Sequence, residues 1–119
     1  MKDINVRYPD TDLKEFQSVI NEKLEAARKE ADSLKTRLDD LERQSGSEGG
    51  HSYGEDSKNQ ENREFITRMY ERQAEKIHSL ELALARIANK TFGVDGETGE
   101  LIPKKRLLAM PTATSLVEY

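Results

Sequence analysis

Two groups of acidic side chains are the first residues in this 119-residue chain that could do chemistry. Glu55 and Asp56 are adjacent acids in a glycine-rich stretch, and two converging carboxylates can hold a divalent cation or act in acid–base catalysis. Three acids and two glycines lie between Asp95 and Glu100, but a calcium loop needs about six oxygen ligands in a longer frame. We therefore expect a turn at residues 95–100. Around Glu55 we expect either a solvated polar loop or a partner contact made by the two acids.

Other catalytic and metal-binding patterns are missing from the sequence. The chain has no cysteine, which excludes disulfides and thiolate zinc ligands. His51 and His78 have no partner at ligand spacing, and no glycine-rich phosphate loop precedes a helix. We expect no enzymatic activity and no bound metal.

A basic cluster near the C-terminus is formed by Lys104, Lys105 and Arg106. Such a cluster suits a phosphate group or an acidic partner surface. The alternative is a solvated face of a short helix, with Arg106 paired to a helix acid such as Glu15. The whole chain carries a net charge of −4, whereas a nucleic-acid-binding surface normally shows a basic excess. We therefore expect a protein partner and no direct sequence-specific DNA binding.

The composition indicates long helices rather than a large globular core. Charged residues make up 35% of the chain and aromatic residues 6%, with no tryptophan, and helices with narrow apolar seams suit that composition. No stretch approaches the roughly 20 apolar residues that span a bilayer. Residues 1–16 contain no apolar run typical of a signal peptide. We expect a cytoplasmic protein without membrane contact.

Apolar residues in the first third of the chain recur every three or four positions. This spacing predicts a helix over about residues 12–43, capped by Thr11 or Asp12, because one face then carries a heptad-like seam. The seam consists of Leu13, Phe16, Ile20, Leu24, Ala27, Ala31, Leu34, Leu38 and Leu41. A loop rich in glycine and serine is expected at residues 44–60.

A second seam predicts a helix over about residues 61–89. It consists of Ile66, Met69, Gln73, Ile77, Leu80, Leu84 and Ile87, and it is expected to be broadened by Phe65, Tyr70 and Ala83. Neither helix can bury a narrow seam alone. An antiparallel helical hairpin over residues 1–90, with the loop at its tip, is the simplest solution because a short connection closes with little entropy loss. Pairing between two chains is the alternative, and we expect a monomer.

Residues 91–119 have a different character. The apolar residues of 92–102 flank a turn-rich pentapeptide and predict a short β-hairpin. One or two helical turns are expected between Pro103 and Pro111, and the last eight residues could add a short strand. This segment is too small to be stable by itself. We expect it to pack on seam residues at the base of the hairpin, near Leu13, Phe16 and Ile87.

The sequence resembles the DksA/TraR family of bacterial transcription regulators, in versions typical of Bacteroidetes. RYPDTDLKEF is similar to the family's N-terminal helix entry, and RQAEKIHSLELALARIANKTFG is similar to its second coiled-coil helix running into a zinc finger. GELIPKKRLLAMPTAT is similar to the middle of that finger, with the pattern I-x-x-x-R-L-x-A-x-P-x-A. The resemblance is strongest over residues 70–114. It implies a mainly α fold, in which a long antiparallel helical hairpin carries a small zinc-finger-like module at residues 91–119.

The resemblance also places the family's metal ligands. In an ungapped register the four zinc cysteines fall on Asp95, Thr98, Leu116 and Tyr119. None of these residues carries a thiolate, so we expect a degenerate module without zinc. A structural zinc normally supplies much of the folding energy of a small finger. We expect packing to replace it, through Phe92, Val94, Leu116 and Tyr119.

The function that the resemblance implies is binding to RNA polymerase. In that family the coiled coil enters the secondary channel, the finger end rests on the polymerase surface, and acids at the tip act near the active centre. The register places the tip positions on Ser52, Glu55 and Ser57, with Asp56 beside them. At the base, the partner contact would be made by the basic cluster at 104–106.

The family's alarmone site is less well matched. Arg72 falls on one basic position of that site, but Ser79 falls on another, and a further position lies past the end of the chain. We therefore do not expect ppGpp as a cofactor.

Two other functions stay open from the sequence. A structural coiled-coil adaptor would self-associate and would not need the loop acids. A transcript-cleavage factor would use Glu55 and Asp56 to hold a catalytic Mg²⁺, and it would lose RNA-cleavage stimulation when both are replaced.

Overall fold

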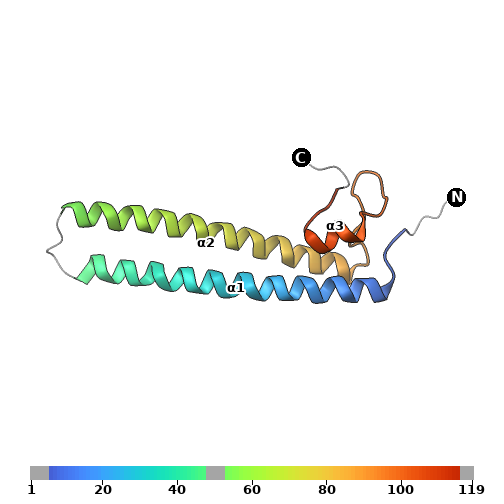
Figure 1. Ribbon diagram of the computed structural model, residues 1–119, viewed down its shortest axis with the longest axis horizontal. Helices are drawn as coiled ribbons and strands as arrows, with labels where there is room; N and C mark the ends of the chain where they lie inside the picture. The colour runs from blue at the N-terminus through green and yellow to red at the C-terminus, as the bar shows by residue number, and fades with distance from the viewer. Residues whose placement is uncertain (1–5, 48–52, 116–119) are drawn as a thin grey trace. The chain divides into compact units, whose positions relative to one another are not determined.

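Two long helices pack against each other in antiparallel directions (Figure 1). The structure is a computed structural model that describes residues 6–47 and 53–115, without the side chains of residues 45–47 and 53–57. Helix α1 runs Asp10–Ser47, helix α2 runs Tyr53–Ala88, and a short helix α3 runs Lys104–Ala109. The helical hairpin that the two seams predict is confirmed.

The inner ends of the two helices differ from the prediction. A loop was expected at residues 44–60, but α1 continues to Ser47 and α2 already begins at Tyr53. Most residues in this stretch cost less than about 0.7 kcal/mol each in a helix, and a single glycine costs about 1 kcal/mol. Seam packing further along the helices can therefore carry the helical backbone past Gly46 and Gly54.

The outer end of α1 also extends beyond its predicted start near residue 12. The backbone N–H of Leu13 donates to the carbonyl of Pro9 at 3.0 Å, so the first turn is already formed at Asp10. Asp10 and Asp12 lie in that first turn, where the helix dipole favours negative charge.

The chain divides into two compact units, and the first contains Met1–Glu25 and His78–Tyr119. Its centre is aromatic: Phe16 is 1% exposed, and its ring centroid lies 5.1 Å from that of Tyr8 and 5.0 Å from that of Phe92. Leu13 and Ile87 are buried around this cluster. The expected packing of the C-terminal segment on the base of the hairpin is therefore confirmed.

Helix α2 ends in a Schellman motif. The N–H of Thr91 donates to the carbonyl of Arg86 at 2.9 Å, and that of Lys90 donates to the carbonyl of Ile87 at 3.0 Å. Lys90 occupies the left-handed position, with φ of 64°. This reversal turns the chain back so that Phe92 can enter the core.

The expected β-hairpin after Phe92 is reduced to a single antiparallel bridge between Val94 and Leu101. Two further backbone bonds join the same stretches, from Asp95 N to Glu100 O at 2.8 Å and from Ile102 N to Gly93 O at 2.7 Å. The turn takes up most of the residues between the two arms, so little chain is left for a ladder. Residues 112–115 do not form the expected strand either, and residues 116–119 lie outside the described part.

The short helix expected after Pro103 is confirmed as α3. It ends before Pro111, as predicted, and it buries Leu107 completely. Ile102, just before the helix, is also fully buried. These two residues complete the apolar core of the first unit.

The second unit, Ala26–Ile77, holds the two helices together along a narrower seam. Its buried apolar residues are small or aliphatic: Ala27, Ala31, Leu34 and Ile66. Phe65 was expected to broaden the seam but is 52% exposed, because the adjacent Ile66 faces α1 and consecutive helical residues point about 100° apart. Across residues 6–47 and 53–115, no helix combines the length and apolar character needed to cross a bilayer.

Candidate functional site

The segment before α1 is fixed to the C-terminal segment by Tyr8. Its hydroxyl donates a hydrogen bond to the carbonyl of Ile102, and its ring meets Phe16 edge-on, with an interplanar angle of 79°. Burial raises the pKa of Tyr8, with a further contribution from Asp12, so the hydroxyl stays protonated and can donate this bond. Sequence reasoning did not single out Tyr8, although it is the second residue of the family-like string RYPDTDLKEF.

Gly93 lies directly against the Tyr8 ring. A Cβ atom at this position would come within 2.8 Å of the Tyr8 ring and 2.9 Å of Leu107, and its φ of +80° favours glycine. The close approach lets Tyr8 cover the core. The glycine after Phe92 in the family-like string TFG was the signal that could have pointed to this contact.

Asp95, which the resemblance places at the first of the family's zinc-ligand positions, closes a tight turn. It is 3% exposed, and its Oδ1 accepts hydrogen bonds from the backbone N–H groups of Glu97 at 2.6 Å and Thr98 at 3.1 Å. The carbonyl of Asp95 accepts from Gly99 N at 2.9 Å. The predicted turn is therefore confirmed, and a carboxylate organises it in the manner of an Asx-turn.

The same turn is tied to the segment that follows α3. The N–H of Gly96 donates to the carbonyl of Thr114 at 3.3 Å, and Ala113 beside it is buried. The two halves of the C-terminal segment are thus joined by backbone hydrogen bonding and packing.

The described residues do not fit a zinc site. The carboxylate of Asp95 already accepts two backbone N–H groups of the turn, and the hydroxyl of Thr98 accepts a hydrogen bond from the N–H of Glu100 at 3.2 Å. Leu116 and Tyr119, which the resemblance places at the other two ligand positions, lie outside the described residues. Within the described ranges, no group of three or more His, Cys, Asp or Glu could hold a metal ion.

Exchanging Asp95 for alanine is expected to lower the free energy of unfolding by about 2 kcal/mol, because the backbone N–H groups of Glu97 and Thr98 lose a charged, buried acceptor. Asp95→Asn should lose much less, since the amide oxygen can still accept both bonds. Urea unfolding of the two variants measures the difference. Equal stability of Asp95→Ala and the parent would show that the turn does not depend on this side chain.

The three residues of the basic cluster have different surroundings: Lys104 pairs with acids of α1, whereas Lys105 and Arg106 line a hollow. The ammonium of Lys104 lies 2.8 Å from the carboxylate of Glu15 and 3.3 Å from that of Asp12, and these bonds raise the pKa of Lys104. The helix acid Glu15 is thus paired with Lys104, whereas the sequence had suggested Arg106. Lys104 ties α3 to α1.

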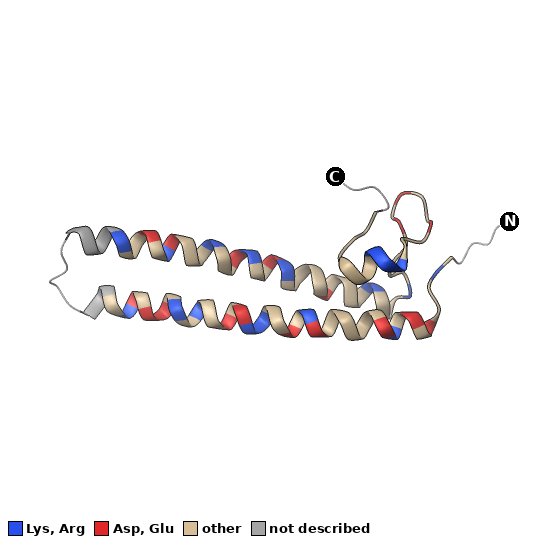
Figure 2. Ribbon diagram, viewed as in Figure 1, with Lys and Arg blue, Asp and Glu red and all other residues tan. Residues whose placement is uncertain are grey.

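Lys105 and Arg106 line a shallow hollow of about 470 Å³ together with Pro103, Ala109 and Met110. Figure 2 shows the basic residues gathered on α3. Met110 is half exposed, so this part of the base presents apolar and cationic groups side by side.

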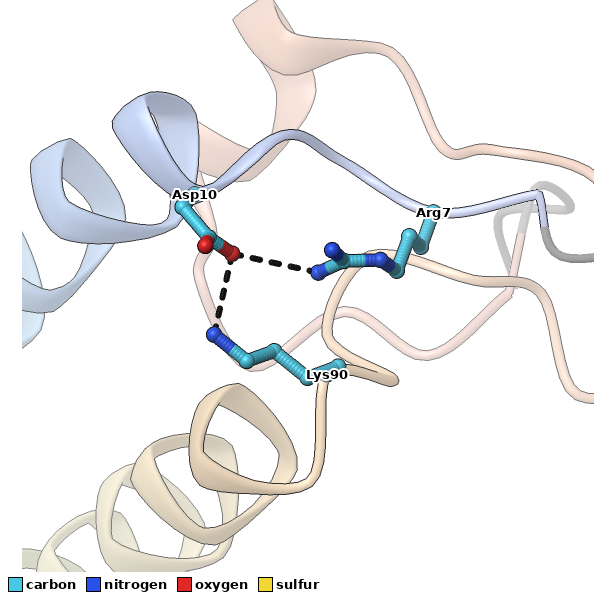
Figure 3. Close-up of polar contacts among 3 residues, drawn as sticks. All are labelled: Arg7, Asp10 and Lys90. Carbon is cyan, nitrogen blue, oxygen red and sulfur yellow. Dashed lines mark hydrogen bonds and ion pairs between the residues drawn. The ribbon is translucent and has the colours of Figure 1, made fainter.

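A second polar tie connects the start of α1 to the end of α2. The Asp10 carboxylate accepts from Lys90 Nζ at 2.9 Å and from the Arg7 guanidinium at 3.2 Å (Figure 3). All three side chains are at least 39% exposed, so solvent screens this cluster and it orients the chain more than it stabilises it. The hydrogen bond from Lys90, followed by that from Arg7, lowers the pKa of Asp10.

This pKa shift predicts a small acid-sensitive component of stability. A carboxyl whose pKa is lower in the folded state adds stability above its unfolded pKa, here 3.8, and loses it as the pH falls through the folded value. Asp10→Asn should therefore flatten the loss of stability below about pH 4. Unfolding by urea between about pH 7 and pH 2 measures it. The control is Asp32→Asn, another exposed acid of α1, and equal acid profiles for both variants would contradict the prediction.

The tip positions are placed in part. Glu55, Asp56 and Ser57 fall within the bounds of α2, near its start, rather than in the loop that the sequence predicted. Ser52 lies outside the described residues. The structure therefore assigns the predicted tip acids a helical backbone.

No family model matches the chain. Over 62 residues the chain is 39% identical to the uncharacterized protein YteA of Bacillus subtilis, and the match covers 44% of the chain but 26% of that longer relative. Among solved structures, transcription factor DksA2 of Pseudomonas aeruginosa is similar, with a TM-score of 0.78 and 28% sequence identity. That similarity covers 88% of this chain and 77% of the DksA2 chain. The protein therefore has a DksA-like fold, and this structural neighbour is a transcription factor.

Proposed function

We propose that this protein is a transcription regulator that binds RNA polymerase through its secondary channel. The observation that carries the proposal is the DksA-like fold, because the similarity to DksA2 covers 88% of the chain. The absence of a basic excess in the chain also favours a protein partner over DNA.

In this proposal the two ends of the hairpin do different work. Glu55 and Asp56 bring negative charge toward the polymerase active centre and alter the equilibrium of promoter complexes. Ser52 and Ser57 flank them and contact the channel. At the base, Lys105 and Arg106 meet the polymerase surface, while Lys104 holds α3 on α1 through Glu15 and Asp12.

Association with purified RNA polymerase at low salt tests the proposal. The parent protein should co-elute with polymerase and change the lifetime of promoter complexes. A double variant, Glu55→Ala with Asp56→Ala, should still bind but should lose the effect on lifetime. The matched control replaces Glu61 and Glu64, two exposed acids further along α2, and should keep both properties.

Failure of the parent protein to associate with polymerase at low salt would refute the proposal. If the same protein formed a dimer in solution, the result would favour a coiled-coil adaptor.

We also propose that the protein works without zinc or ppGpp. The chain lacks cysteine, and Asp95 and Thr98 already use their side-chain oxygens within the turn. A metal chelator should therefore leave the thermal unfolding midpoint unchanged. A chelator-dependent fall in the midpoint, restored by added Zn²⁺, would show that the module is metal-bound.

A further inference from the structure

An exposed aromatic side chain marks a hollow on the hairpin. Phe65 is 52% exposed on α2, next to the buried Ile66 and opposite the half-buried Leu41 of α1. Together with Arg37, Asp40 and Asn62, these residues line a hollow of about 410 Å³. All of them belong to the second unit, so both helices build the hollow within one compact part.

The exposure of Phe65 is unusual for this protein. The large apolar residues that the described part exposes are Val6, Phe65, Leu82 and Met110, and Phe65 is the aromatic one among them. The seam of the second unit closes without it, because Ile66 and Leu34 are already buried. An aromatic ring left at the edge of a hollow, where the fold does not need it, is typical of an anchor for a partner.

The charges at the rim of the hollow favour an acidic neighbour. Asp40 is paired with Arg43 on the next turn of α1, so its negative charge is balanced. Arg37 makes no ion pair with another described residue, and Asn62 is neutral. The rim therefore carries an unbalanced positive charge beside an apolar floor.

We propose that this hollow receives an apolar side chain of RNA polymerase, and that a neighbouring polymerase carboxylate pairs with Arg37. The inference rests on the proposed function and adds a contact along the hairpin that is separate from the tip acids. A second copy of this chain is a poorer occupant. A stable dimer interface takes roughly 20–30 residues from each chain, and the six residues that line the hollow fall far short of that number. In the proposed complex with polymerase, the channel around the hairpin supplies further contacts outside the hollow.

The test compares two serine variants of the full chain in a binding titration with purified RNA polymerase. Phe65→Ser should weaken the affinity about tenfold or more, because an anchor is lost. The matched control is Leu82→Ser, which alters a residue that is 47% exposed on the same helix but lies outside the hollow, and it should bind within about twofold of the parent. Urea unfolding of both variants checks that each remains folded.

A second pair of variants tests the charge. Arg37→Glu should weaken binding and reduce its dependence on salt, whereas Lys35→Gln, which removes a cation that does not line the hollow, should leave both unchanged. This pair keeps the inference testable if Phe65→Ser fails to fold.

The outcomes separate the two proposals. If the parent binds polymerase and Phe65→Ser and Arg37→Glu bind equally well, the hollow is not a contact, although the proposed function stands. If the parent forms a dimer that Phe65→Ser dissociates, the occupant is a second copy and the inference is overturned. If the parent does not bind polymerase at all, the proposed function fails and the inference fails with it.

Discussion

Replacing Phe16 by alanine is expected to lower the free energy of unfolding by about 3–5 kcal/mol. Phe16 is 1% exposed and is the shared neighbour of Tyr8 and Phe92, so its ring joins three segments of the chain. Its removal leaves a cavity that the neighbours cannot fill, because Tyr8 is held by the Ile102 carbonyl and Phe92 is fixed by the reversal at Lys90. Aromatic contacts worth about 0.5–1.5 kcal/mol each are lost as well.

Urea unfolding followed by circular dichroism measures this loss. Leu82→Ala is the matched control, because Leu82 is 47% exposed on α2 and should lose less than about 1 kcal/mol. Phe16→Leu keeps most of the apolar volume and should fall between the two. A Phe16→Ala variant as stable as Leu82→Ala would mean that the aromatic cluster does not hold the base together.

The sequence was sufficient for the features that depend on periodic spacing. Apolar residues every three or four positions predicted both helices and their pairing, and the seam from Leu13 to Leu34 is buried as expected. Pro103 and Pro111 bounded α3 correctly, because proline limits a helix at both ends in a local and readable way. The predicted inner ends of the two helices were wrong, because clustered glycine and serine predict a loop over residues 44–60, whereas α1 continues to Ser47 and α2 begins at Tyr53.

The contacts at the base could not be predicted, because they join residues far apart in the chain. Tyr8 and Ile102 are 94 positions apart, and Lys104 and Asp12 are 92 positions apart. No spacing rule links such residues. Val94 was expected to replace the zinc by packing, yet it is half-buried, and Ile102 and Leu107 fill the core instead.

The role of Asp95 shows the same limit at short range. The resemblance marked it as a position that had lost its cysteine, and the acid-rich stretch predicted a turn. Neither showed that the carboxylate itself would bind the backbone of that turn. The contribution of Asp95 therefore depends on the two hydrogen bonds that its carboxylate accepts, and residue type and spacing alone did not predict them.

Gly93→Ala is expected to lower the free energy of unfolding by about 2–5 kcal/mol. Two effects add at this position. The φ of +80° is unfavourable for alanine, and the new Cβ would lie 2.8 Å from the Tyr8 ring and 2.9 Å from Leu107. Tyr8 cannot move away easily, because its ring contacts Phe16 and its hydroxyl is bonded to Ile102.

Gly99→Ala separates the two effects. Gly99 has a similar φ of +75°, but nothing lies within 4 Å of where its Cβ would be. Gly99→Ala should therefore lower the free energy of unfolding by the cost of the backbone conformation alone, about 1–2 kcal/mol. The difference between the two variants in urea unfolding gives the contribution of close packing under Tyr8. If the two glycines respond equally, Tyr8 is free to shift, and the segment before α1 cannot be the rigid cover of the base that its contacts indicate.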